Sequence, residues 1–251
     1  MTNENLSLKD RVVSFVWQHI WLLVSLYVMT VGVAVCVRSM LGSSVISVIP
    51  YVMQDAGFAH LAPELTIGQY TWLMNCLLVV GQIIVLRKDF ELVQLFQLLV
   101  GFVFGSFIDL NMWLTSWMVD LNLWQEVIAQ VLGCTILAYG IAMEVRCGSV
   151  TMPGEGLPVA ISRKIGKEFP KVKIFVDITL VVIGVILCFV FFGKWLTHII
   201  GIGTLFAMIY VGFMVRMSGK TLGWFNQVLG YRPGFRRYVY GLARFIKRDN
   251  S

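Results

Sequence analysis

Residues 12–37 read VVSFVWQHIWLLVSLYVMTVGVAVCV, and this stretch decides the class of fold. Its 26 residues carry no formal charge, and a helix needs roughly 20 mainly apolar residues to cross the hydrocarbon core of a membrane. Residues 65–86 and 195–215 also lack charges and are 22 and 21 residues long. Shorter apolar stretches occupy residues 92–108, 127–143 and 174–193. Together they predict an all-α integral membrane protein.

The composition of the whole chain excludes an ordinary soluble domain. Of 251 residues, 58% are hydrophobic and 14% are charged, whereas a typical soluble domain has about 25% charged residues. The first apolar stretch is too long for the core of a signal peptide, and no small-x-small cleavage site follows it. We therefore expect it to be retained as the first membrane span.

Six spans account best for the distribution of basic residues. We place them at residues 13–37, 66–86, 91–109, 123–145, 173–193 and 197–216. If residues 1–12 are cytoplasmic, 18 of the 20 Lys and Arg residues face the cytoplasm, and only Arg38 and Lys194 face outward. Cytoplasmic loops of membrane proteins carry an excess of basic residues, so both termini are predicted to be cytoplasmic. An eight-span alternative lowers the inside count to 15.

Two apolar segments between these spans are interrupted by Gly and Pro. Residues 39–54 read SMLGSSVISVIPYVMQ, and residues 147–165 read CGSVTMPGEGLPVAISRKI. Irregular backbone is tolerated at membrane depth only where protein or a watery cavity covers it. We interpret both segments as re-entrant or broken half-helices; the eight-span alternative would have them cross.

The two interrupted segments hold matching places in an internal repeat. The motif from Gly32 to Arg38 parallels the motif from Gly140 to Arg146, 108 residues later, and an interrupted segment follows each. A further match pairs Gly105 with Gly212, 107 residues apart. Each half, at residues 13–109 and 123–216, thus has three spans. Because three is odd, the second half is predicted to be inverted relative to the first, as in many secondary transporters.

Two other segments are predicted to lie at membrane surfaces. Residues 110–122 carry Trp113 and Trp117 on one helical face and are expected to form an interfacial helix on the outer side. The basic tail, residues 217–251, has aromatic residues at helical spacing and is predicted to lie as an amphipathic helix on anionic lipids. The alternative for this tail is a contact surface for a regulatory protein.

The arrangement resembles the YczE/YyaS/YitT family of bacterial membrane proteins over residues 16–216. The resemblance rests on the breaks after the first span of each half, on Met152-Pro153-Gly154-Glu155-Gly156-Leu157, and on Gly201-Ile202-Gly203-Thr204. It implies a multi-pass protein of the bacterial cytoplasmic membrane. It supplies neither an established substrate nor catalytic residues.

Polar residues next to the interrupted segments are the candidates for function. Broken helices expose free N–H groups and positive dipole ends, which attract anions. We predict that a small polar solute, neutral or anionic, is bound by Arg38, Ser43, Ser44, Asn75, Arg146, Ser149 and Thr151. Because charged groups inside a membrane are costly and usually functional, proton coupling is assigned to Glu144, Glu155 and Asp177.

Several of these residues also have ordinary structural interpretations. Arg38 and Arg146 can snorkel to the two membrane surfaces, and Asp177 can pair with Lys173 one helical turn away. Glu155 can be a solvated loop residue, and Asn75 alone can serve as interhelical hydrogen-bonding glue.

The resulting prediction is a secondary transporter, with a non-transporting membrane scaffold or regulator as the alternative. No HExxH or GxSxG motif is present, so an enzyme is not expected, and neither are cofactors or metals, because the five cysteines lack metal-ligand spacing. The expected partners are the lipid bilayer, anionic lipids and the solute, and not nucleic acid. Glycines in the spans suit close packing within one chain or a homodimer.

Overall fold

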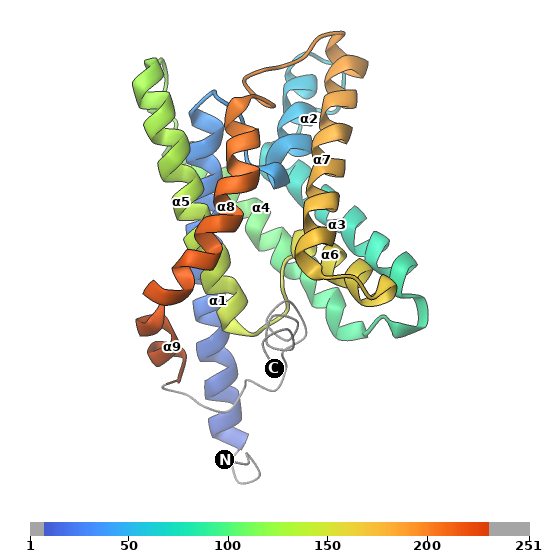
Figure 1. Ribbon diagram of the computed structural model, residues 1–251, viewed down its shortest axis with the longest axis vertical. Helices are drawn as coiled ribbons and strands as arrows, with labels where there is room; N and C mark the ends of the chain where they lie inside the picture. Colours follow the sequence, from blue (N-terminus) through green and yellow to red (C-terminus); the bar gives the residue numbers. More distant parts are fainter. Residues whose placement is uncertain (1–7, 231–251) are drawn as a thin grey trace.

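The computed structural model describes residues 8–230, and within that range the chain is helical, with no strand (Figure 1). The long helices are α1 (Leu8–Arg38), α3 (Ile67–Leu86), α4 (Phe96–Leu114), α5 (Leu123–Cys147), α7 (Phe169–Phe192) and α8 (Ile202–Thr221). The shorter ones are α2 (Val48–Phe58), α6 (Pro153–Ile165) and α9 (Gly223–Gly230). Single turns of 3-10 helix lie at Val45–Ser47 (η1), Arg87–Asp89 (η2) and Leu92–Leu95 (η3).

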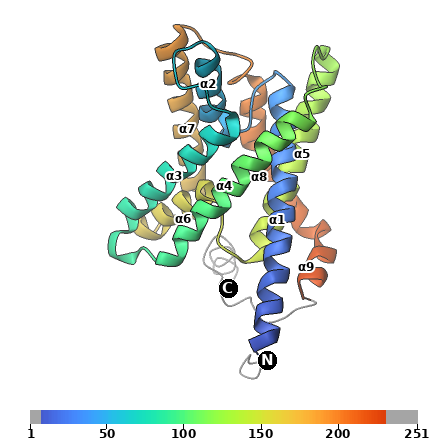
Figure 2. The same ribbon diagram turned by 180° about the vertical axis from the view of Figure 1, so that it is seen from behind.

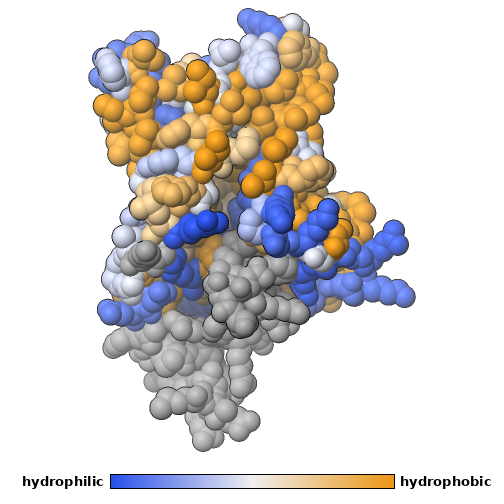
Figure 3. All heavy atoms as spheres, viewed as in Figure 1, coloured by the Kyte–Doolittle hydropathy of each residue, from blue (hydrophilic) through white to orange (hydrophobic). Residues whose placement is uncertain are grey.

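The long helices have the surface of membrane spans. Helices α1, α3, α4, α5 and α7 are long and apolar enough to cross a membrane, and α8 with α9 provides a sixth span if this bent pair is counted as one. Only 22% of the most apolar stretch of α7 is buried inside the protein. Its remaining apolar side chains, like the orange band in Figure 3, face outward. The protein is therefore a helical membrane protein.

Helices α2 and α6 do not cross the molecule. Helix α1 rises to the upper end of Figure 1, the chain turns back, and α2 starts at mid-height and returns to the upper end. Helix α6 likewise starts inside and returns to the lower end, where α5 finished. With 11 and 13 residues at about 1.5 Å per residue, both are too short for a hydrocarbon core of about 30 Å. Each interrupted segment thus contains one short helix, called a half-helix below because of its length, and the eight-span alternative is not supported.

The centre of the molecule is the crossing of α1 and α5, which pack along most of their length (Figures 1 and 2). Glycines permit this close approach. A Cβ atom on Gly32 would lie 2.4 Å from Leu137 N, and one on Gly133 would lie 2.7 Å from Cys36 Sγ. Around this pair, α4 packs on α1 and α8 packs on α5.

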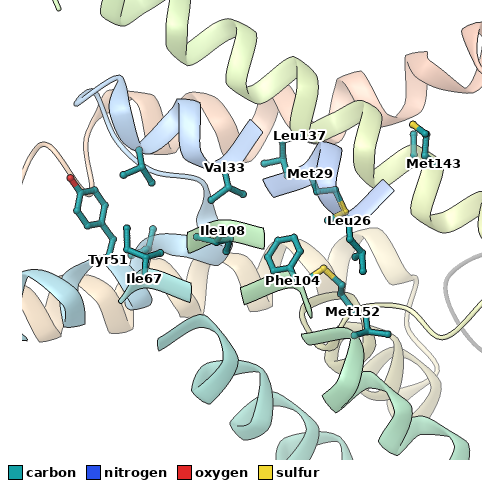
Figure 4. Close-up of a cluster of buried hydrophobic side chains, with 14 of the residues drawn as sticks. Leu26, Met29, Val33, Tyr51, Ile67, Phe104, Ile108, Leu137, Met143 and Met152 are labelled. Atoms are coloured by element: carbon teal, nitrogen blue, oxygen red, sulfur yellow. The ribbon is translucent and has the colours of Figure 1, made fainter. Parts of the chain in front are cut away.

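Helices α2 and α6 are both held by α3 and α7. Helix α2 packs on α3 and α7, and α6 packs on α7 and α3. The start of α6 reaches the main hydrophobic core, where Met152 lies beside Leu26 of α1 and Phe104 of α4 (Figure 4). The two half-helices also meet, because a Cβ atom on Gly154 would lie 2.7 Å from Ile46 Cδ1, just before α2.

The structure differs from the predicted boundaries at several places. Helix α4 continues to Leu114, so residues 110–114 are its last turns, and no separate interfacial helix occupies residues 110–122. Residues 115–122 form turns that lead to Asn122, which caps α5 through reciprocal hydrogen bonds with Gln125. Trp113 and Trp117 are nevertheless exposed at this end, as expected of interfacial side chains. Of the predicted tail, residues 217–230 form the end of α8 and helix α9, and the residues predicted to form an amphipathic helix fall on 231–251, outside the described residues.

Candidate functional site

The turn between α1 and α2 is fastened to the start of α8. Gly42 has φ +138°, a conformation that disfavours side chains, and a Cβ there would lie 2.6 Å from Thr204 N. The backbone N–H and the hydroxyl of Ser43 both donate to Ile199 O, at 2.8 and 3.1 Å. The hydroxyls of Ser44 and Ser47 lie 2.6 Å apart. The predicted binding residues Ser43 and Ser44 are thus buried, and their hydroxyls are engaged within the protein.

Arg38 and Arg146 are not brought together. Arg38 ends α1 at the upper end, where its Nη2 donates to Met112 O at 2.8 Å. Arg146 is near the lower end of α5, where its Nη1 donates to Ala142 O one turn earlier. A single cavity lined by both arginines is therefore not present, because the two helices run in opposite directions through the molecule.

Glu144 belongs to the last turns of α5, and its side chain contacts the start of half-helix α6. It is 2% exposed, and its Oε1 accepts a hydrogen bond from the backbone N–H of Met152 at 2.8 Å. Met152 is the residue that caps α6, so the carboxylate faces the positive end of that helix. The second oxygen, Oε2, has no hydrogen-bond partner among the described residues. Glu144 is the only acidic residue of the candidate site without a basic partner there.

Thr151 and Ser149 lie on the extended segment between α5 and α6. Thr151 is 5% exposed and lies next to Met152. The Ser149 hydroxyl is 3.2 Å from His19 Nε2 of α1. Both predicted binding residues are thus close to Glu144 along the chain.

Glu155 and Asp177 share a single cation. Lys173 Nζ lies 2.6 Å from Asp177 Oδ1 and 3.4 Å from Glu155 Oε1, and all three side chains are mostly buried. Glu155 belongs to α6, whereas Lys173 and Asp177 belong to α7. This triad therefore ties the half-helix to its neighbour and carries one net negative charge.

The upper part of the interface between α3 and α4 is capped by an acidic residue that sequence reasoning missed. Asp109 accepts a hydrogen bond from the Thr66 hydroxyl at 2.7 Å and one from Gly68 N at 2.9 Å. Thr66 is the N-cap of α3, so Asp109 supports the positive end of that helix. Below Asp109, the backbones of α3 and α4 approach each other closely at Gly68 and Gly105. A Cβ atom on Gly105 would lie 2.5 Å from Gly68 O.

Amide side chains line the middle of the same interface. Asn75 is 0% exposed, and neither its Nδ2 nor its Oδ1 has a hydrogen-bond partner among residues 8–230. It lies against Gly101, where an added Cβ atom would be 3.1 Å from Asn75 Nδ2. Two turns further along α3, Gln82 and Gln97 exchange two side-chain hydrogen bonds of 2.8 and 3.1 Å. Each buried polar group without a partner costs about 1–3 kcal/mol, so Asn75 is a costly residue in this conformation.

The lower end of this interface opens into a small pocket. Its volume is about 20 Å³, which is room for about one water molecule. It is lined by Gln82, Leu86, Gln94, Gln97, Thr151, Gly156, Val159, Ala160 and Arg163. Gln94 is 8% exposed and its Oε1 lacks a hydrogen-bond partner among the described residues. Gln94 and Arg163 were not predicted as site residues, because their meeting depends on how α6 docks against α3.

Comparison with known proteins identifies one family. A family model described as a family of unknown function, DUF6198, matches residues 16–220. No curated protein and no solved structure matches the chain. The resemblance to the YczE/YyaS/YitT family stays a prediction.

Proposed function

Since the chain belongs to the DUF6198 family, whose function is unknown, we propose a function from the geometry alone, namely secondary transport of a small polar solute. One observation carries this proposal. Two half-helices start inside the membrane protein, their first turns meet, and a buried carboxylate with one unpartnered oxygen lies at the start of one of them. The proposed membrane is the bacterial cytoplasmic membrane, with both termini in the cytoplasm.

The proposal includes an inverted repeat. The order of a long helix, a half-helix and two long helices occurs in α1–α4 and again in α5–α8. Exchanging the halves converts the contact of α2 with α7 into that of α6 with α3, and both contacts exist. It also converts α1 with α4 into α5 with α8. Such reciprocal packing supports a pseudo-two-fold axis that passes through the crossing of α1 and α5.

Glu144 is the proposed proton carrier. A carboxylate inside a membrane protein is costly, and Glu144 lacks the basic partner that Glu155 and Asp177 have in Lys173. Protonation of Glu144 would weaken its attraction to the start of α6, and that would let proton binding alter the position of the half-helix. Glu155 and Asp177 would join the coupling only if Lys173 released them during transport.

The groups around the half-helices are proposed to bind the solute. Asn75 and Thr151 are proposed to offer hydrogen bonds in the inner part. Ser149, Ser43 and Ser44 would join them only after their hydroxyls release His19, Ile199 O and Ser47. Arg38 and Arg146, at opposite ends, would donate hydrogen bonds to a polar solute that enters from either side and would not contact it together. The basic tail is proposed to bind anionic lipids of the inner leaflet.

Uptake into proteoliposomes tests this function. Purified protein is assayed with radiolabelled amino acids, carboxylates, amides and polyols, with and without a pH gradient. We expect Glu144→Gln to retain exchange of a transported solute but to lose accumulation driven by the gradient. Glu126→Gln is the matched control, because Glu126 is in the first turn of the same helix, far from α6, and should behave like the wild type.

Two results would contradict the proposal. If Glu144→Gln accumulates solute as the wild type does, Glu144 is not the proton carrier. If the wild-type protein moves none of the solutes, the scaffold or regulator alternative is favoured. In that case, a phenotype of Arg236→Ala in the tail together with none for Arg146→Ala would support a regulator.

A further inference from the structure

No single structural role explains all of the amide side chains at the interface of α3 and α4. Asn75 and Gln82 are seven residues apart and therefore lie on one face of α3. Gln97 lies opposite Gln82, and Gln94 is one turn before it. We call Asn75, Gln82, Gln94 and Gln97 the amide strip. Three atoms of the strip, both polar atoms of Asn75 and Gln94 Oε1, are buried without a partner among the described residues.

Glycines of α4 and α6 lie directly against the amide strip. Gly101 faces Asn75 and presents no side chain, and Gly156 of α6 covers the glutamine pair. A Cβ on Gly156 would lie 2.7 Å from Gln97 Oε1 and 2.8 Å from Gln82 Nε2. At its lower end the strip meets the small pocket lined by Gln94 and Thr151. The glycines thus keep side chains away from the polar atoms along the strip.

We propose that the amide strip recognises a neutral solute that presents both hydrogen-bond donors and acceptors, such as a polyol or a carboxamide. An amide side chain offers both donors and an acceptor, so a row of them matches a solute of the same kind. No residue of the strip carries a charge, and the only charged residue that lines the pocket at its lower end is Arg163. Beyond Arg163, a charged solute would lose its hydration along the strip without gaining a counter-charge. This inference rests on the proposed transport function and narrows its solute class to neutral molecules.

The strip is closed here, and the second half of the chain indicates how it opens. Helices α3 and α4 pack tightly, but their counterparts α7 and α8 diverge and do not form a comparable interface in the described residues (Figure 1). The matching glycines differ in the same way. A Cβ on Gly105 would lie 2.5 Å from Gly68 O, whereas one on Gly212 would have no neighbouring atom within 4 Å. In an inverted repeat, the opposite state has α8 docked on α7 at Gly212 and α4 moved away from α3.

Counterflow in proteoliposomes tests the solute class. The probes are radiolabelled mannitol and malonamide as neutral solutes, malate as an anion and choline as a cation. We expect exchange of at least one neutral probe and none of the charged ones. Exchange of malate or choline without any neutral probe would overturn the inference and leave transport intact. Absence of exchange for all four probes would overturn the inference and remove the support for transport.

Two pairs of variants test the strip and its opening. Asn75→Leu should lower neutral exchange at least tenfold while raising the melting temperature, because its unpartnered atoms are removed; a purely structural Asn75 would give a lower melting temperature. Thr71→Val, one turn away on the same face and bonded only to Ile67 O, is the control. Gly212→Phe should leave the melting temperature unchanged but reduce exchange at least tenfold. Ile202→Phe, at an exposed position in the first turn of α8 and roughly 15 Å from Gly212, should leave both unchanged. Normal exchange by Gly212→Phe would refute the opening of the strip.

Discussion

The crossing of α1 and α5 gives a quantitative prediction for Gly133→Ala. The added Cβ would lie 2.7 Å from Cys36 Sγ and 2.9 Å from Gly32 O. Since nonbonded atoms pack best at about 3.5–4.0 Å, the two helices have to separate by roughly 0.6–1.3 Å. Strain of this kind costs about 1–3 kcal/mol. Alanine, however, favours a helix over glycine by about 1 kcal/mol, so the two effects partly cancel in the variant alone.

Gly212→Ala isolates the steric cost. Gly212 is inside α8 and has open space around its Cβ position, so this variant gains the same helix preference without a clash. The free energy of unfolding of Gly133→Ala should therefore be lower than that of Gly212→Ala by about 1–3 kcal/mol. At roughly 2–4 °C per kcal/mol for a protein of this size, thermal unfolding in detergent should separate the two variants by about 2–12 °C. Equal melting temperatures would refute the tight crossing.

Three further predictions concern charged residues. Asp109→Ala should destabilise the protein by about 0.5–2 kcal/mol through loss of the α3 cap, measured by thermal unfolding; an unchanged melting temperature would argue against the cap. Lys173→Met leaves two partly buried carboxylates unpaired and should cost about 3–5 kcal/mol in SDS unfolding. Lys171→Met, on an exposed ion pair, should change stability by less than about 0.5 kcal/mol, and equal effects would refute the triad's role. Cysteine labelling from outside intact cells should reach Lys194→Cys but not Arg87→Cys, and labelling of the latter would reverse or replace the proposed orientation.

The membrane class and the half-helices could be predicted because both depend on local composition. A charge-free stretch of 20 residues and a Gly/Pro break are visible without knowledge of the fold, and α1, α3, α2 and α6 appear where they were expected. The Lys173–Asp177 pair was also foreseen, since a helix fixes the distance between residues four apart. Glu144 could be singled out because a short acidic side chain on a span has little access to the surface.

The remaining features depend on how helices lie against each other. Asp109 was missed because its partners, Thr66 and Gly68, are on another helix, and the register of α3 against α4 cannot be read from either sequence. The pairing of Gln82 with Gln97 was missed for the same reason. Arg38 and Arg146 lie at or near the ends of α1 and α5, and because these two helices run in opposite directions, the arginines lie at opposite ends of the molecule.

The central pair of helices also constrains the biosynthesis of the chain. Helix α1 relies on α5 for its closest packing, and its Gln18 side chain donates a hydrogen bond to the carbonyl of Cys147. Ser39, just after α1, donates another to Gln130 Oε1 at 2.7 Å. The start of α5 is roughly 85 residues beyond the end of α1, so at about 5–20 residues per second α1 waits on the order of ten seconds in the membrane. During that interval its glycine face and polar side chains meet only lipid, α4 or the insertion machinery, and the first half cannot complete its own interior before the second half arrives.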